Sequence, residues 1–292
     1  MLEALPCRDD AVLARSRMKE LDIGRERAAE LGRTALAAVH EGRYRRDDGR
    51  EVDWSAAVAA AVAARRSLPP NEPLPEHAAV VHPVTRVVVS NETTLGAARR
   101  LTEAGLRPLA LNFANGVEPG GGFLRGALAQ EETLCRSSAL IATLDGDPMY
   151  HAHRRGARDV ASDWAILSPD VPVFRQDDGA ALERPWLLSF VTSAAPYAPT
   201  VGQPRSLELL RARILRVLGV ARAFGYDTLV LGAWGCGAFA NDPTRTAADF
   251  RAALEQEFAG SFREVVFAIA DWSPQRRFLA PFRDAFAGSG AG

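Results

Sequence analysis

The chain has 292 residues, of which 47% are hydrophobic, enough for a substantial core in one large domain or two small ones. Its formal net charge of −1 excludes the global basic field that recruits nucleic acid, so we expect no direct sequence-specific nucleic-acid binding. Lys19 is the only lysine, which excludes a P-loop lysine and a Schiff-base lysine from the central region.

No export signal, membrane span or metal site is evident in the sequence. The first 21 residues are charged throughout, and no apolar run approaches the ~20 residues that span a bilayer. Cys7, Cys135 and Cys236 lie far apart and lack metal-ligand spacing, so we expect free thiols. We therefore predict a soluble cytoplasmic protein with no membrane partner.

Residues 1–75 are predicted to form an N-terminal helical accessory region, and residues 76–292 the main, catalytic domain. Asp22 is a candidate N-cap for a helix with apolar positions at helical spacing, namely Ala28, Leu31, Ala35 and Val39.

The two regions are expected to form one compact unit. Asp48-Gly49 predicts a hairpin turn within the accessory region. Ser55 is a candidate N-cap for a second helix over residues 56–66. The proline-rich stretch 68–73 then predicts a linker.

Strands and helices alternate from residue 84 onward. Apolar, β-branched runs predict strands at 84–89, 109–113, 186–192, 228–231 and 265–269. Helical periods predict helices at 95–105, 131–144, 207–221 (capped by Ser206) and 244–258. The stretch 163–174 contains Pro169 and Pro172, which favours an edge or a loop-rich strand pair. This order predicts an α/β sandwich around a mixed or parallel sheet.

The most informative segment is Asn115–Leu134, which follows the strand at 109–113. Gly120, Gly121 and Gly122 are followed, after seven residues, by Gln130, Glu131 and Glu132. A loop without Cβ atoms lets backbone N–H groups approach a ligand closely. Two carboxylates at a helix start beside such a loop indicate chemistry on an anionic substrate.

Glu131 and Glu132 project about 100° apart on a helix, so they cannot face one another across a bond as a glycosidase pair does. One carboxylate can point at the reacting centre while the other contacts a different hydroxyl. The plainer alternative is two acids that favour the helix dipole. The glycine triplet just upstream favours the functional interpretation.

A second glycine loop, 232–242, follows the strand at 228–231 and leads into a helix with Asp242 as N-cap and Pro243 at its first position. Two such loops can clamp a diphosphate with backbone N–H groups; the alternative is two tight turns. The run 235–240 also matches the G-x-G-x-x-A dinucleotide pattern weakly, because the helix starts too late.

His151 and His153 form an H-x-H pair without an evident third metal ligand, and a solvated loop is the expected structure there. Arg154, Arg155 and Arg158 follow closely. They form either a solvated face or a contact with polymer phosphates.

Taken together, the strand end Asn112-Phe-Ala-Asn115, the GGG–QEE spacing and the second glycine loop resemble the bacterial-type poly(ADP-ribose) glycohydrolases. The segment Gly42-Arg-Tyr44 resembles the accessory region of the same family. The resemblance implies a macrodomain-like three-layer sandwich with a mixed central sheet and an N-terminal helical extension. It also implies hydrolysis of ribose–ribose O-glycosidic bonds to release ADP-ribose, without a cofactor or metal.

The resemblance further assigns roles to residues. Glu132 would be the general acid and base, with a pKa raised by burial, and Glu131 would bind ribose hydroxyls. Ligand-binding residues would be Asn115, Gly120, Gly121, Gly122, Phe123, Gln130, Gly235, Cys236, Gly237, Ala238 and Phe239. Phe239 would stack on adenine, or else be a core aromatic.

The partners implied by the resemblance are poly(ADP-ribose), ADP-ribose and poly-ADP-ribosylated proteins, in the response to DNA damage. Two other functions stay open from the sequence. A non-catalytic ADP-ribose-binding module would keep both glycine loops without needing an acid at Glu132. A nicotinamide-dependent oxidoreductase would use the loop at Gly235.

Overall fold

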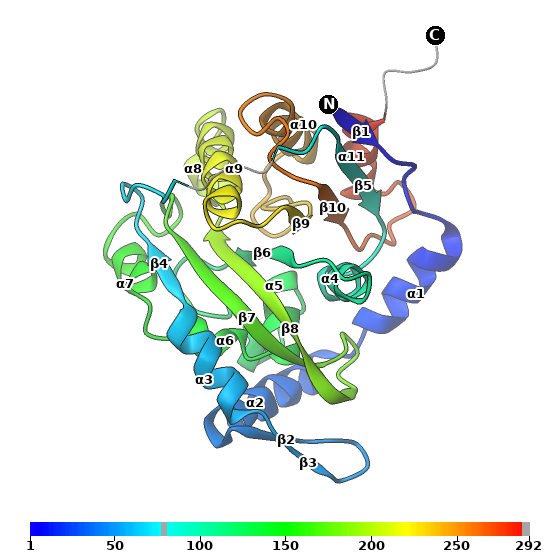
Figure 1. The fold of residues 1–292 in the computed structure, drawn as a ribbon, viewed down its shortest axis with the longest axis vertical. Coiled ribbons are helices and arrows are strands. Elements are labelled where there is room, and N and C mark those ends of the chain that lie inside the picture. The colour runs from blue at the N-terminus through cyan, green and yellow to red at the C-terminus, as the bar shows by residue number, and fades with distance from the viewer. Residues whose placement is uncertain (77–80, 288–292) are drawn as a thin grey trace. The chain divides into compact units, whose positions relative to one another are not determined.

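The computed structural model describes residues 1–76 and 81–287 (Figure 1). Its contacts group the chain into two compact units, each assembled from segments that are distant in sequence. Unit 1 comprises Met1–Met18, Asn71–Leu111 and Ala195–Gly292, and unit 2 comprises Lys19–Pro70 and Asn112–Ala194. The expected division at residues 75 and 76 stays a prediction.

Unit 1 is built on parallel strands in the order β1, β5, β10, β9 and β6. Their bounds are Leu2–Ala4, Thr85–Ser90, Glu264–Ala268, Thr228–Leu231 and Pro108–Ala114, and β6 continues into unit 2 after Leu111. Val265 pairs with Val87 on one side and Leu229 on the other, and all three are buried. Apolar runs of this kind are typical of parallel strands covered on both faces. The sequence predicted every one of these strands except β1.

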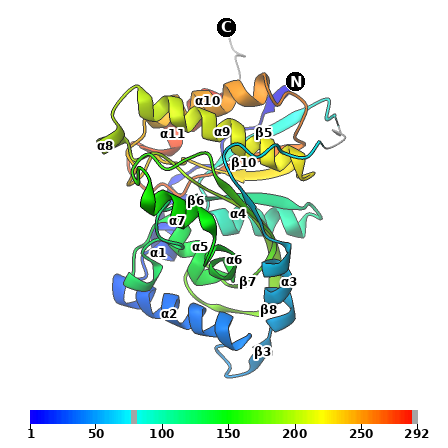
Figure 2. The same cartoon turned by 90° about the vertical axis from the view of Figure 1, so that its left-hand side faces the viewer.

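Several helices of unit 1 have a capping side chain or a proline at their first turn. The helices of this unit are α1 (Ala11–Leu21), α4 (Thr94–Glu103), α8 (Ala198–Val201), α9 (Arg205–Ala223), α10 (Pro243–Glu255) and α11 (Leu279–Phe286). Asp242 caps α10 as predicted, by accepting the N–H groups of Thr244 and Arg245. The predicted cap at Ser206 is wrong, because α9 already begins at Arg205 and Ser206 is buried within it. Helix α10 packs against α9 and α11 (Figure 2).

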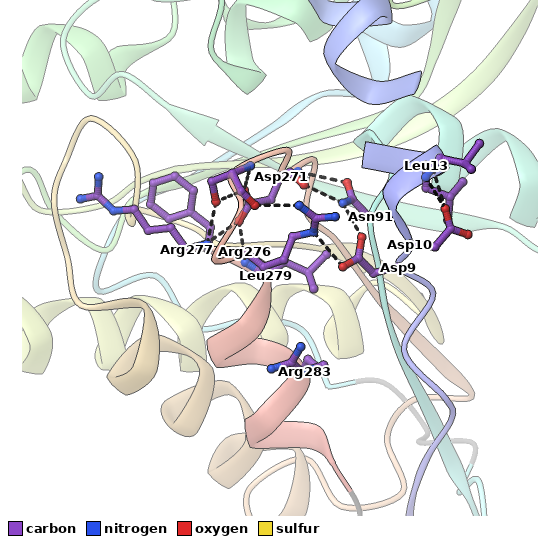
Figure 3. Close-up of polar contacts among 12 residues, drawn as sticks. Asp9, Asp10, Leu13, Asn91, Asp271, Arg276, Arg277, Leu279 and Arg283 are labelled. Atoms are coloured by element: carbon purple, nitrogen blue, oxygen red, sulfur yellow. Dashed lines mark hydrogen bonds and ion pairs between the residues drawn. The ribbon is translucent and has the colours of Figure 1, made fainter. Parts of the chain in front are cut away.

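A polar network ties the beginning of the chain to its end within unit 1 (Figure 3). Asn91 donates to Asp9 Oδ1 and to the carbonyl of Asp271, and Arg276 pairs with Asp9 at 2.8 Å. Asp271 in turn accepts the backbone N–H groups of Ser273, Phe278 and Leu279 and the hydroxyl of Ser273. One buried carboxylate therefore organises the turn that leads into α11.

The strands of unit 2 are antiparallel. Strand β7 (Ala165–Arg175) pairs with β8 (Ala181–Ala194) on one side and with β4 (Arg66–Leu68) on the other. The predicted edge or strand pair at 163–174 is wrong, because β7 is continuous and has a partner on each side. Pro169 falls in a bulge between Ser168 and Val171, so its missing N–H interrupts no regular pair. Strands β2 (Arg43–Arg45) and β3 (Glu51–Asp53) form the predicted hairpin.

Two helix starts in unit 2 differ from prediction. Helix α2 (Arg25–Glu41) has Gly24 as its N-cap, because α1 extends to Leu21 and leaves Asp22 in the link between the two helices. Helix α3 (Ser55–Ala64) includes Ser55 as its first residue, and Asp53 accepts the N–H and O–H of Ser55. The expected linker at 68–73 begins with the last residue of β4.

The predicted helix at 131–144 is divided in two. Helices α5 (Gln130–Ser137) and α6 (Leu140–Leu144) are separated by Ser138, which is extended and bridges Val173. The Ser138 hydroxyl donates to Leu134 O and accepts the N–H of Leu140, so one side chain ends the first helix and begins the second. Unit 2 also contains the short helix η1 (Phe123–Arg125) and α7 (Pro148–Arg155).

The α/β class with parallel and antiparallel strands is confirmed. In the described ranges, none of the helices has the length and apolar character that crossing a bilayer requires.

Asp271→Ala should lower the free energy of unfolding by about 2–4 kcal/mol, because hydrogen bonds to a charged acceptor are each worth ~1.5–3 kcal/mol and water replaces only some of them. Denaturant titration measures this change. Asp284→Ala is the control, since Asp284 is exposed and, within residues 1–76 and 81–287, forms an ion pair only with neighbouring Arg283. Equal effects of the two substitutions would contradict the proposed role of Asp271.

Candidate active site

The glycine triplet belongs to a tight loop, residues 115–122, which we call the triplet loop. Asn115 Oδ1 accepts the N–H groups of Val117 and Glu118, which turns the chain immediately after β6. The N–H of Gly121 donates to Glu118 O at 3.0 Å and closes the loop. Asn115 Nδ2 donates to no residue in the described part of the chain, so the amide group keeps its donor available.

Glu132 lies against the backbone of the triplet loop. The N–H of Gly122 donates to Glu132 Oε1 at 2.9 Å. A Cβ atom on Gly121 would stand 2.5 Å from Glu132 Oε1 and 3.1 Å from Glu131 Oε2. Both carboxylates of the first turn of α5 therefore converge on Gly121, and only glycine leaves room for them. Glu132 is 8% exposed, and its Oε2 atom is buried without a hydrogen-bond partner among the described residues.

Glu131 is held more tightly than Glu132. Its Oε2 accepts the N–H of Asn115 at 2.7 Å, and its Oε1 accepts Asn112 Nδ2 at 3.4 Å. Burial raises the pKa of the Glu131 carboxyl to about 8; the Asn115 N–H opposes this rise, and the charge of Glu132 adds to it. Burial, with the charge of Glu131, also raises the pKa values of Cys135 and Tyr150 well above their ordinary values. Cys135 and Tyr150 are therefore uncharged at neutral pH.

Gln130 and Phe123 are structural supports in this structure. Gln130 Oε1 accepts the N–H of Phe113 at 2.9 Å, which ties the start of α5 to β6. Phe123 is buried, and its ring lies against the position that a Cβ of Gly120 would take. Both side chains therefore fix the distance between the strand, the loop and the helix.

The N–H groups of the triplet loop, which the sequence analysis expected to face a ligand, already donate within the protein. Gly121 donates to Glu118 O, Gly122 to Glu132 Oε1, and Phe123 to Gly120 O at 3.3 Å. Gly121 is thus required by the close approach of the carboxylates, whereas a Cβ at Gly120 would meet Phe123 and one at Gly122 would meet Ala127. Binding of a diphosphate by these amides stays a prediction.

The second glycine loop, 232–242, lies in unit 1 and has a different character. Asn241 Nδ2 donates to Pro196 O and Gly235 O and so fixes the start of the loop. The N–H groups of Gly237, Ala238 and Phe239 find no acceptor in the described ranges, and Gly237 and Ala238 are exposed. Consecutive free N–H groups of this kind form an anion-binding concavity.

Phe239 and Cys236 differ in exposure. Phe239 is only partly buried and packs edge-on against Tyr197 with ring centroids 5.8 Å apart, so it is not a core aromatic. Its stacking on adenine stays a prediction. Cys236 is buried, and burial raises the pKa of its thiol to about 12, which makes it an unreactive structural residue. The helix after this loop starts only at Pro243, outside the glycine run, which disfavours the dinucleotide-binding alternative.

His151 and His153 lie on helix α7, so the predicted loop is wrong. The Asp147 side chain accepts the N–H of Met149, and Pro148 occupies the first helical position, a start signal that the sequence carries. His153 is buried, with Nδ1 at 2.8 Å from Gly116 O and Nε2 at 2.6 Å from Ser162 Oγ. It therefore supports the triplet loop, a role that sequence reasoning missed. No group of three or more metal-ligating side chains occurs within residues 1–76 and 81–287.

Comparisons with known proteins bear on this arrangement. The family model described as "Microbial-type PARG, catalytic domain" matches residues 32–176. A poly(ADP-ribose) glycohydrolase structure from Thermomonospora curvata is 42% identical, with a TM-score of 0.83, over 89% of this chain and all (100%) of its own. The Thermomonospora curvata enzyme bound to the inhibitor ADP-HPD matches at 41% identity and a TM-score of 0.81, over 89% of this chain and 99% of its own.

The poly(ADP-ribose) glycohydrolase of Deinococcus radiodurans in complex with ADP-ribose matches at 42% identity and a TM-score of 0.73, over 78% of this chain and 96% of its own. No curated protein sequence matches the chain. The structural matches confirm the expected macrodomain-like α/β fold.

Gly121→Ala should destabilise the protein by about 1–3 kcal/mol more than Gly49→Ala, because its methyl group would collide with Glu132. Gly49 is a matched control: its φ of +83° resembles the +57° of Gly121, but a Cβ there would meet nothing within 4 Å. Both variants are compared by denaturant titration. Equal losses would mean that only the backbone conformation matters at Gly121.

The pH dependence of stability should report the proton on Glu131. The folded-state pKa of about 8 lies above the ordinary value of 4.5, so its contribution to stability is complete below 4.5 and is lost as the pH rises towards 8. Relative to Glu131→Gln, the wild-type melting temperature should therefore fall across this window. Parallel curves for the two proteins would show that Glu131 does not retain its proton.

Proposed function

Since the chain belongs to the microbial-type poly(ADP-ribose) glycohydrolase family and is a glycosidase that releases ADP-ribose from poly(ADP-ribose), we propose that Glu132 is the general acid and base of the reaction. The observation that carries this proposal is the Oε2 atom of Glu132. It is buried and has no hydrogen-bond partner among the described residues. An unpaired carboxylate oxygen in a protein interior is costly, and such groups concentrate where a substrate completes the hydrogen bonding.

The contacts of Glu132 determine which oxygen carries the proton. Oε1 accepts the N–H of Gly122, so in the acid form the proton resides on Oε2. Glu132 then protonates the 2′-oxygen that leaves with the adjacent adenosine ribose. The distal ribose passes through an oxocarbenium-like state, stabilised by the nearby diphosphate. The Oε2 carboxylate finally takes a proton from the attacking water, which restores the acid.

Glu131 and Asn115 position the distal ribose. Glu131 is immobilised by the Asn115 N–H and Asn112, and with a pKa of about 8 it is neutral at neutral pH. A neutral Glu131 can donate to a ribose hydroxyl. Asn115 Nδ2, which has no acceptor in the described part of the chain, supplies a further donor.

The phosphate-binding role belongs to the second glycine loop. Its support is the run of free N–H groups at Gly237, Ala238 and Phe239, and the partly buried ring of Phe239 is suited to stack on adenine. The Deinococcus radiodurans relative was solved with ADP-ribose and the Thermomonospora curvata relative with the inhibitor ADP-HPD. Because these relatives were solved with ADP-ribose or an inhibitor, we propose that this chain also binds ADP-ribose.

The proposal extends to poly-ADP-ribosylated proteins as partners, because a glycohydrolase acts on the polymer wherever it is attached. The three cysteines, Cys7, Cys135 and Cys236, form no disulfide, which supports a reducing compartment such as the cytoplasm. We extend the proposal to a part in the response to DNA damage, which is tested by the sensitivity of a deletion strain to DNA breaks.

Glu132→Gln should lower turnover of poly(ADP-ribose) by about 10²–10⁴-fold with little change in ADP-ribose affinity, because glutamine keeps the shape but transfers no proton. Glu131→Gln, the matched neighbour, should weaken ADP-ribose binding and lower turnover less. Polymer hydrolysis and ADP-ribose titration of both variants distinguish the two roles. Near wild-type turnover of Glu132→Gln would remove the catalytic assignment and favour a non-catalytic binding module.

ADP-ribose should raise the melting temperature of the wild-type protein, by the equivalent of about 2.7 kcal/mol at a hundredfold excess over its dissociation constant. Gly237→Val should abolish most of this shift without unfolding the protein, because a Cβ at Gly237 meets no protein atom within 4 Å but would stand where phosphate must approach. An unchanged shift in the variant would show that the second glycine loop is an ordinary turn.

A further inference from the structure

Two arginines touch consecutive residues of the triplet loop. Arg154 Nη1 donates to Val117 O at 2.7 Å, and Arg125 forms a two-pronged ion pair with Glu118, with both contacts at 2.6 Å. Both arginines are exposed. These contacts hold the two guanidinium groups on the loop whose Gly121 and Gly122 face Glu132.

Arg125 also lies close to Glu132. A Cβ placed on Gly122 would be 3.8 Å from Arg125 Nη2 and 3.7 Å from Glu132 Oε1. Arg125 and the proposed acid thus both lie close to Gly122. A group that contacts Arg125 is therefore near Glu132 as well.

The positive charge continues along the exposed side of α7 and the residues after it. Arg154, Arg155 and Arg158 fall within five positions, and none forms an ion pair with a carboxylate in the described ranges. Arg155 contacts His151 Nε2 at 3.4 Å, and Arg158 donates to Arg154 O at 3.4 Å, so their charges remain available. We call Arg125, Arg154, Arg155 and Arg158 the cationic rim.

This local concentration of charge contrasts with the chain as a whole, whose net charge is −1. A long-range field cannot attract a polyanion here, so any such attraction must come from a local surface. Arginine suits this task, because its planar guanidinium forms paired hydrogen bonds to phosphate oxygens. Poly(ADP-ribose) presents one diphosphate in every repeating unit, and a unit beyond the scissile bond must leave the site past its border.

We propose that the cationic rim binds the diphosphate of the ADP-ribose unit next to the scissile bond, so that the enzyme holds polymer more tightly than monomeric ADP-ribose. The inference rests on the proposed function of Glu132. Arg154, whose Nη1 donates to Val117 O, places a cation without a carboxylate partner in the described ranges beside the triplet loop, and Arg155 and Arg158 continue the contact along the polymer.

The test uses Glu132→Gln as background, so that polymer stays intact during a binding measurement. Into it we introduce Arg155→Gln together with Arg158→Gln, both outside the catalytic machinery. The control is Arg33→Gln with Arg184→Gln, which removes the same charge from two other exposed arginines of unit 2 that form no ion pair with a described residue. Affinities for poly(ADP-ribose) of defined length and for monomeric ADP-ribose are measured at several salt concentrations.

The rim variant should bind polymer roughly three- to thirtyfold more weakly, since each exposed charge contact is worth up to ~1 kcal/mol. Its salt dependence should be shallower by about one unit of slope per lost phosphate contact. ADP-ribose affinity and the control should not change. Unchanged polymer affinity, an equal loss for ADP-ribose, or an equal loss in the control would overturn the proposal.

Two further measurements separate this inference from others. A single-stranded oligonucleotide with the same number of phosphates should compete poorly; equal competition would make the rim a general polyanion surface and overturn its assignment to the polymer. Turnover is measured separately, in proteins with an intact rim that carry Glu132 or Glu132→Gln. Equal affinity of the intact rim for polymer and for ADP-ribose, with turnover lost in Glu132→Gln, would refute the rim alone. Selective polymer binding with near wild-type turnover of Glu132→Gln would refute the catalytic proposal alone.

Discussion

The backbone of the triplet loop and the carboxylate of Glu132 approach each other so closely that no side chain fits between them. A Cβ on Gly121 would stand 2.5 Å from Glu132 Oε1, and the neighbouring N–H of Gly122 is the donor that holds this oxygen. Three neighbouring side chains hold the loop and the helix in this position. Gln130 fixes the helix start to β6, Asn115 turns the chain, and His153 holds the carbonyl of Gly116 from the other side.

The same approach sets the electrostatics of the site. Two carboxylates brought together in a buried place cannot both carry a charge cheaply. Burial raises the pKa of Glu131 to about 8, while Glu132 keeps one oxygen without a protein partner in the described ranges. The start of α5 favours negative charge, so its dipole opposes the neutral state of Glu131 and desolvation prevails. The two carboxylates therefore differ: Glu131 is held on both oxygens, and Glu132 on one.

The sequence could predict the elements whose signal is local. The GGG–QEE spacing indicated a loop and a helix that share one site, and the contacts of Gly121 with both glutamates agree with it. The strands at 228–231 and 265–269 were evident because buried parallel strands are continuously apolar. The role of a glycine was ambiguous from the sequence. Gly121 makes room for two carboxylates, whereas at Gly237 the backbone N–H has no acceptor in the described ranges. Only the structure distinguishes these two roles.

What the sequence could not predict depends on contacts between distant residues. Strands β1 and β4 have three residues each, too few for a periodic pattern, and exist because β5 and β7 pair with them. The break at Ser138 needs Val173 as a partner. The support that His153 gives to Gly116 joins residues 37 positions apart. In each case a contact between distant residues determines the local structure, and no residue spacing in the sequence indicates that contact.

Chemical rescue of Glu132→Ala tests the central claim most directly, because it asks whether a carboxylic acid at this one position is what the reaction needs. Formate added to this variant should restore polymer hydrolysis in proportion to its concentration, whereas formate should restore nothing to Glu131→Ala, whose proposed role is binding. Near wild-type hydrolysis by Glu132→Ala without formate would contradict the account.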